Sequence, residues 1–227
     1  MRTLVLDIET AALPWLDLDP IQRATITKGA EGGAAYRAKK DLRSLSPYAA
    51  KVIVVSLLDP DTGNGRLLFE SEKPMESDSA DGLFDLFGGT EAAILAETWA
   101  SLAKCDRVVT FNGRGFDGPF LSVRSAIHGL KPTRNLVGNR YNLREHVDLY
   151  EVLTFQGAMQ ARPSLHVACV SFGIPSPKVG DVSGAHVGEA FRQGRIAEIL
   201  EYGRRDVEAT AALFRRLEST LLPLFFL

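Results

Sequence analysis

The sequence has few of the residues that build disulfide frameworks or zinc sites. It contains two cysteines and four histidines in 227 residues, and Cys105 and Cys169 show no Cys-x-x-Cys or Cys/His spacing. Neither a disulfide framework nor a structural zinc site is therefore expected. Both cysteines are predicted to be buried as small apolar side chains. A reducing compartment fits this composition.

Long hydrophobic runs are also missing. No apolar stretch approaches the roughly 20 residues that a membrane-spanning helix needs, and Asp7 interrupts the first apolar stretch, where a signal peptide would be continuous. We therefore expect no membrane segment, no secretion and a cytoplasmic location. A mean hydropathy near zero and 24% charged residues are ordinary globular values. We expect one domain over residues 1–227, because this length and 45% hydrophobic residues allow a substantial core.

An excess of positive charge is missing as well. Lys and Arg total 26 while Asp and Glu total 28, which gives a net charge of −2. The molecule as a whole therefore does not hold nucleic acid by charge alone. Binding of a polyanion would depend on local groups, and metal ions held by clustered carboxylates could supply local positive charge. This directs attention to the acidic residues.

Apolar periodicity and turn residues predict an α/β fold. Between the first two predicted strands we expect a long, partly helical and mobile excursion over residues 17–46, and residues 71–81 form a polar stretch. The strands 51–58 and 65–70 flank a turn-rich segment and should form an antiparallel hairpin. The other predicted strands cover 4–9, 106–111 and 146–150, and the predicted helices cover 90–103, 116–128, 164–172, 186–192 and 195–218.

Two carboxylates stand at the end of the best predicted strand. Asp7 and Glu9 are two residues apart, so their side chains point to the same face. Two adjacent acids beside a core repel each other unless cations neutralise them, and Mg²⁺ or Mn²⁺ are natural candidates. The alternative is a strand end that emerges into solvent, where acids are harmless. This pair alone leaves both interpretations open.

A third carboxylate follows a second strand. Asp117 comes after the strand 106–111 and its turn, at the start of a helix. Ligand sites of open α/β sheets collect at such strand ends. The alternative is that Asp117 only caps its own helix and that Asn112-Gly113 is an ordinary turn.

The last predicted helix carries a fourth acid on its apolar face. Tyr202 and Asp206 are four residues apart and share a face with Ile199. An acid on such an inward stripe requires a partner. The charged residues on the opposite side are interpreted as a solvated face, in which Glu201 and Arg205 form a favourable i,i+4 pair.

Together these residues resemble the DEDD exonuclease superfamily, specifically its tyrosine subtype and the proofreading-like domains related to family B DNA polymerases. The resemblance spans most of the chain. The tyrosine subtype is indicated because the histidine subtype would place histidine at position 201, which is glutamate. The three motifs of the superfamily correspond to segments 6–10, 111–121 and 202–210.

The resemblance implies a ribonuclease H-like fold, with a mixed central sheet and helices on both faces. It also implies a metal-dependent 3′–5′ exonuclease that hydrolyses phosphodiester bonds from the 3′ end of single-stranded nucleic acid, with DNA favoured and RNA possible. Tyr202 would orient or deprotonate the attacking water, orientation being favoured by the usual tyrosine pKa of ~10. The implied ligands of two Mg²⁺ or Mn²⁺ ions are Asp7, Glu9, Asp117 and Asp206.

The resemblance also suggests contacts with the substrate. Thr10, Asn112 and Phe116 are expected near the terminal nucleotide, Asn112 through a hydrogen bond and Phe116 through stacking. A core position for Phe116 fits the pattern equally well. Two places depart from the family's pattern, Arg114-Gly115 in the second motif and Gly203 in the third, and both bear on substrate preference.

Two other functions stay open at this point. A non-catalytic nucleic-acid-binding module of the same fold would normally have lost a metal ligand, and none is missing here. A metal-dependent hydrolase of small nucleotides would have a closed pocket in place of an open groove for a strand.

Overall fold

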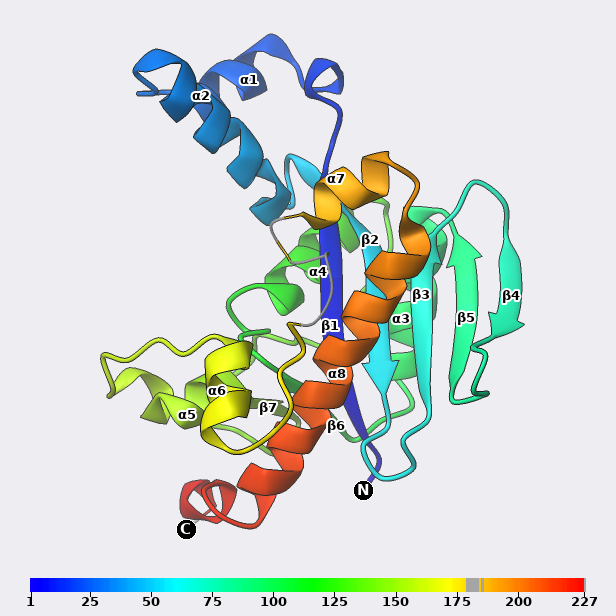
Figure 1. The fold of residues 1–227 in the computed structure, drawn as a ribbon, viewed down its shortest axis with the longest axis vertical. Helices are drawn as coiled ribbons and strands as arrows, with labels where there is room; N and C mark the ends of the chain where they lie inside the picture. The colour runs from blue at the N-terminus through cyan, green and yellow to red at the C-terminus, as the bar shows by residue number, and fades with distance from the viewer. Residues whose placement is uncertain (179–183, 185, 227) are drawn as a thin grey trace.

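A seven-stranded mixed sheet forms the centre of the protein, with the strand order β4-β5-β3-β2-β1-β6-β7 (Figure 1). The computed structural model describes residues 1–178, 184 and 186–226. The strands are β1 (Thr3–Ala12), β2 (Ala50–Leu58), β3 (Gly65–Glu70), β4 (Met75–Asp78), β5 (Phe84–Gly89), β6 (Arg107–Thr110) and β7 (His146–Asp148).

Helices lie on both faces of this sheet. In Figure 1, α8 crosses the front of the sheet, while α3 and α4 lie behind it. The α-helices are α1 (Pro20–Thr27), α2 (Gly32–Asp41), α3 (Glu91–Leu102), α4 (Asp117–Ile127), α5 (Leu149–Leu153), α6 (Leu165–Ser171), α7 (Val187–Arg192) and α8 (Ile196–Glu218). Short 3-10 turns occur at η1 (Trp15–Asp17), η2 (Leu42–Leu45), η3 (Phe155–Gly157) and η4 (Leu222–Phe225).

The strand directions confirm a mixed sheet. β2 is antiparallel to both β1 and β3, so the predicted hairpin is correct, with Val54 opposite Phe69. β6 is parallel to β1 and to β7. At the other side of the sheet, β5 is parallel to β3 and antiparallel to β4. The expected α/β architecture with helices on both faces is therefore confirmed.

The central strand β1 shows how the sequence separates the two faces. Leu4, Leu6 and Ile8 belong to the core cluster that contains residues of α3 and α4. Val5 belongs to the cluster on the other face, which contains residues of α8. Because side chains alternate along a strand, Asp7 and Glu9 share the face of Val5. The acids therefore point toward α8.

Two strands were not predicted. β4 is formed by four exposed residues within the polar stretch 71–81, so no alternation of apolar and polar residues marks it. β5 ends in Gly88-Gly89, which are uncommon inside strands. A Cβ atom added at Gly88 would lie 2.6 Å from Met75 of β4. This glycine therefore allows the close approach of the edge strand.

Residues 13–49, between β1 and β2, form the predicted partly helical excursion. Neither α1 nor α2 buries a residue, and Figure 1 shows both helices beyond the end of the sheet. The capping box of Asp19 and Gln22 begins α1. The helical content is confirmed, while the mobility of the segment stays a prediction. No helix in the described ranges is long and apolar enough to cross a membrane.

Candidate metal centre

The two acids of β1 lie beside an irregularity in the sheet. Asp7 is opposite Ser56 and Glu9 is opposite Val54, but the next pair joins Thr10 to Val52. Ile53 is therefore an extra residue of β2, as in a β-bulge, which bends the strand locally. The register of the sheet shifts immediately after the two acids.

The third acid comes from α8, nearly 200 residues later in the chain. Asp206 lies on the buried stripe of this helix with Tyr202. One carboxylate oxygen from each of Asp7, Glu9 and Asp206 lies within 4.8 Å of the others. Packing of α8 against the acidic face of β1 therefore forms a compact carboxylate cluster, which we call the carboxylate trio.

Asp117 is not one of the three clustered acids, but it is hydrogen-bonded to the same strand, β1. It is the first residue of α4, and one of its oxygens accepts a hydrogen bond of 3.1 Å from the backbone N–H of Ile8. The ladder between β1 and β6 ends at the pair Val5 and Val109, so Asp117 accepts from β1 beyond the end of β6. Phe116, which precedes the helix, makes no side-chain cap. The side chain of Asp117 thus contacts β1 as well as beginning a helix.

The four acids are electrostatically unfavourable for one another. Burial raises the pKa of Asp7 and of Glu9 well above the usual range, and the charges of Asp117 and Asp206 raise both further. Burial also raises the pKa of Asp117 to about 7. In the described part of the chain, no Lys, Arg or His forms an ion pair with any of the four. Among the residues that the structure describes, no cationic side chain is paired directly with this negative charge.

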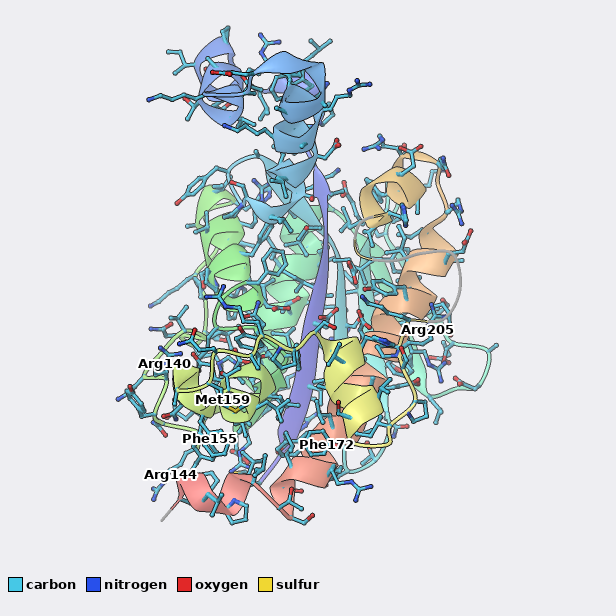
Figure 2. The ribbon with its side chains drawn as sticks, turned by 60° about the vertical axis from the view of Figure 1, so that its left-hand side comes forward. Arg140, Arg144, Phe155, Met159, Phe172 and Arg205 are labelled. Carbon is cyan, nitrogen blue, oxygen red and sulfur yellow. The ribbon has the colours of Figure 1, made fainter. Side chains whose placement is uncertain are left out.

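Asp206 has weak local compensation. Burial raises its pKa to about 6, while the neighbouring Tyr202 hydroxyl and the charges of Arg205 and Lys178 lower it. Figure 2 shows Arg205 on α8. Its guanidinium is bound to Glu201 at 3.3 Å and to the carbonyl of Pro177 at 3.3 Å. The guanidinium of Arg205 is therefore hydrogen-bonded to groups outside the trio.

Tyr202 stays protonated in this setting. Burial raises the pKa of its hydroxyl, and the negative charges of Glu9, Asp206 and Asp7 raise it further. The hydroxyl interacts with Asp206, which raises the pKa of Tyr202 and lowers that of Asp206. Its side chain is therefore placed at the trio as a hydrogen-bond donor, because formation of a phenolate beside these acids is disfavoured.

The three residues expected near a substrate lie in different environments. Thr10 is buried and donates from its hydroxyl to the carbonyl of Ser44 at 2.6 Å, which fixes the base of the excursion. Asn112 is exposed, with a positive φ of 66°. Phe116 is half-buried, packs against the core cluster behind the sheet and contacts the ring of Phe120. The core position for Phe116 is therefore present, and its stacking on a substrate stays a prediction.

Asp148 is a positioning residue that the sequence pattern did not single out. It ends β7 and is fully buried. Its two oxygens accept the backbone N–H groups of Asn112 at 2.8 Å and Arg114 at 2.9 Å. Asp148 thereby holds the turn that leads to Asp117. Its place at the end of a strand parallel to β6 is the signal that could have identified it.

The structure explains the unusual Arg114 of the second motif. Its guanidinium is buried, lies 3.1 Å from Glu151 and donates to the carbonyl of His146 at 2.9 Å. Arg140, labelled in Figure 2, also binds Glu151 at 2.8 Å. Arg114 is thus bound to the segment around β7, so its presence in the motif has a structural cause.

The donor set favours a hard divalent cation. Carboxylate oxygens are the preferred protein ligands of Mg²⁺ and Mn²⁺, and the trio offers neither sulfur nor imidazole. Cations would also remove the repulsion that raises the pKa values of the acids. The residues present therefore fit a divalent metal.

The comparisons with known proteins assign the chain to a family and support its fold. Residues 51–221 match the family model described as "Predicted 3'-5' exonuclease related to the exonuclease domain of PolB". The match covers most of the chain, so the chain belongs to this family of the exonuclease superfamily. The matched range includes Asp117, Tyr202 and Asp206, whereas Asp7 and Glu9 precede it.

Solved structures support the same fold. The family B DNA polymerase of the hyperthermophilic archaeon Pyrobaculum calidifontis superposes with a TM-score of 0.62 at 18% identity, over 96% of this chain. The match covers 24% of the polymerase chain, so the chain spans about a quarter of that protein. This likeness shows the ribonuclease H-like fold. The search of curated proteins returned no match.

Proposed function

We propose that the chain is a metal-dependent 3′–5′ exonuclease of the tyrosine subtype, acting on single-stranded nucleic acid with DNA favoured over RNA. The observation that carries the proposal is the convergence of Asp7, Glu9 and Asp206 within 4.8 Å without a cationic partner among the described residues. The family's relation to the exonuclease domain of PolB supports the direction of hydrolysis and the preference for DNA. The continuous sheet supports one exonuclease-like domain over residues 1–227.

The four acids would together form the proposed metal site. Asp7, Glu9 and Asp206 would hold two Mg²⁺ or Mn²⁺ ions together with Asp117. When bound, such ions lower the pKa of water and neutralise charge on the phosphate and the departing 3′ oxygen. Asp117 would face the ions while it accepts from Ile8, so α4 and β1 keep their relative position. No protein nucleophile is required.

Tyr202 would orient the attacking water. Its hydroxyl interacts with Asp206, and the raised pKa keeps the proton on the oxygen. A role as a phenolate base is therefore disfavoured, and hydrogen bonding is its proposed contribution. Asn112, which is exposed beside the turn to Asp117, is proposed to hydrogen-bond the terminal nucleotide, whereas Phe116 and Thr10 would line the same path.

The test is digestion of matched 5′-end-labelled single-stranded DNA, single-stranded RNA and duplex DNA, with Mg²⁺ or Mn²⁺ and with EDTA. We expect a ladder of products that shorten from the 3′ end, release of mononucleotides, the fastest rate on single-stranded DNA and no reaction in EDTA. Binding without hydrolysis would instead support a non-catalytic module. Hydrolysis of free nucleotides but not oligonucleotides would support a small-molecule hydrolase.

A second test examines recognition of the chain end. A linear strand with a free 3′ hydroxyl should shorten stepwise, whereas a circular strand of the same sequence should survive. Gel analysis of the circle and its linearised form distinguishes the two. Rapid cutting of the circle would assign the protein to endonucleases and overturn the proposed exonuclease.

A further inference from the structure

The helix that carries Tyr202 and Asp206 approaches the sheet unusually closely at Gly203. A Cβ atom added to Gly203 would lie 2.5 Å from Oγ of Ser56 on β2. Real carbon and oxygen atoms that are not bonded stay well beyond this distance, so the present packing leaves no space for a side chain there. The next atom, a methyl carbon of Val54, would be at an ordinary 3.7 Å.

The glycine has no other structural justification. Gly203 lies inside α8 with a negative φ, so an alanine could adopt its backbone conformation. Glycine inside a helix costs about 1 kcal/mol relative to alanine. The close contact with Ser56 is the feature of the described structure that accounts for accepting this cost.

Ser56 occupies the matching position in the sheet. It is opposite Asp7 in the ladder between β1 and β2, and it is buried with 1% exposure. Its hydroxyl has no hydrogen-bond partner within the part of the chain that the structure describes. The hydroxyl therefore contributes volume beneath α8 and not a bond.

We infer that Gly203, packed on Ser56, is a positioning residue that sets the distance between α8 and β2 and thereby brings Tyr202 and Asp206 to Asp7 and Glu9. Gly203 immediately follows Tyr202 and lies three residues before Asp206, about one helical turn. A side chain at position 203 would push this turn of the helix away from the sheet. The inference rests on the proposed function only for its catalytic consequence, because the packing exists independently.

Two substitutions, alone and combined, test the contact between Gly203 and Ser56. Gly203→Ala introduces the clash, and Ser56→Ala removes the oxygen that causes it. In the double variant, the new methyl group would meet Val54 at 3.7 Å and the Cβ atom of residue 56 at 3.8 Å. Both are ordinary contacts. The matched control is Gly33→Ala in α2, where an added Cβ atom would meet nothing closer than 3.9 Å.

The measurements are thermal unfolding in EDTA, calorimetric titration with Mn²⁺ alone, and kcat and KM on single-stranded DNA. For Gly203→Ala we expect weaker Mn²⁺ binding and a kcat about 10²-fold lower, because misplacement of a reacting group by roughly 1 Å can have that effect. KM for the strand should change little. Adding Ser56→Ala should restore Mn²⁺ affinity and most of kcat, while Gly33→Ala should leave both unchanged.

Two results would overturn the inference. If Gly203→Ala binds Mn²⁺ and turns over as the parent does, the Ser56 hydroxyl rotates aside and the contact sets no distance. If Ser56→Ala does not rescue Gly203→Ala, the defect has another source. A failure of the proposed function is recognised separately, since the parent protein would then be inactive, while unfolding and Mn²⁺ titration would still report the contact.

Discussion

Two buried acidic sites in this protein differ in how their charge is balanced. Behind the sheet, Glu91 accepts from Arg124 at 2.8 and 2.5 Å, from the N–H of Val52 at 2.9 Å, and is 2.7 Å from His128. In front of the sheet, the carboxylate trio has no such partners among the described residues. Glu91, Glu9 and Asp206 are buried to a similar extent, while Asp7 is partly exposed.

The pKa values show the consequence of this difference. Burial alone would raise the pKa of Glu91, but the hydrogen bonds from Arg124, His128 and Val52 bring it below the usual value. In the trio, burial and neighbouring acids act in the same direction and raise it. A buried acid with complete partners stabilises the fold, whereas buried acids without partners indicate a ligand that the protein chain does not itself provide.

The largest expected effect is loss of nuclease activity when the trio loses one acid. Asp206→Asn should abolish hydrolysis, because a neutral amide cannot replace a carboxylate that holds a divalent cation. Without metal, the variant should melt at the same temperature or higher, since one repulsive charge is gone. Nuclease assays and calorimetry in EDTA measure both quantities.

The matched control is Glu208→Gln, an exposed acid of the same helix that binds Arg204. It should retain full activity. Near-normal turnover by purified Asp206→Asn would remove Asp206 from the ligand set. The equivalent variant Asp7→Asn should behave like Asp206→Asn.

The next largest effect concerns the hydroxyl of Tyr202. Tyr202→Phe keeps the ring and its packing but removes the hydroxyl that interacts with Asp206. Loss of a positioned acid-base or orienting group lowers turnover by ~10²–10⁴-fold, or roughly 3–5 kcal/mol. We expect this decrease in kcat at saturating metal with little change in oligonucleotide binding. The exposed Tyr141→Phe is the control, and normal turnover with earlier melting would make Tyr202 structural.

The Glu91 site should respond in the opposite way, with a loss of stability and little change in turnover. Glu91→Gln leaves Arg124 buried without its counter-charge, and breaking a buried ion pair in this manner costs about 3 kcal/mol. Denaturant unfolding should show this loss, while kcat of the folded fraction stays near that of the parent. Glu97→Gln, half-buried on α3 and paired with Arg66 at 3.1 Å, should change stability little. An unaltered denaturation midpoint for Glu91→Gln would contradict the contrast between the Glu91 site and the carboxylate trio.

The smallest effect is a difference in pH dependence. The raised pKa values of Asp117 and Asp206, about 7 and about 6, mean that the metal-free fold gains stability by holding protons. This contribution is complete below about pH 4, the usual range of these acids, and is lost as pH rises through 6 and 7. The lowered pKa of Glu91 has the opposite sign, since its contribution is present above about pH 4.5 and is lost on acidification.

Unfolding free energies in EDTA should therefore decrease by a few kcal/mol between pH 5 and 8. Saturating Mn²⁺ should remove this pH dependence of the unfolding free energy, because bound cations take the place of protons. Asp206→Asn should reduce it in EDTA. A flat profile without metal would show that the four acids do not titrate as described.

The sequence predicted the parts of the fold that repeat a simple pattern. β1, β2 and α8 have strong apolar periodicity and lie where expected. β4 could not be predicted because all its residues are exposed and its strand character comes from pairing with β5. Its conformation is determined by tertiary context, which local sequence does not contain.

The sequence likewise predicted only those parts of the candidate site that local spacing reveals. Spacing placed Asp7 with Glu9 and Tyr202 with Asp206, and the structure brings these pairs together. The bond from Ile8 to Asp117 spans 109 residues, and no local pattern could reveal it. The packing of Gly203 on Ser56 was equally hidden, so this glycine looked like a departure from a motif. The roles of these residues stay predictions until the variants are measured.

The position of the trio in the chain has a consequence for how the protein matures. Two acids belong to the first strand, and the third belongs to the last long helix. Contacts between such distant segments form late, because closing long loops is entropically unfavourable before the intervening structure exists. On a ribosome, β1 would emerge long before α8. The site can therefore assemble only when nearly the whole chain is available, so a partly synthesised or partly folded copy would carry the first two acids but lack the complete carboxylate trio.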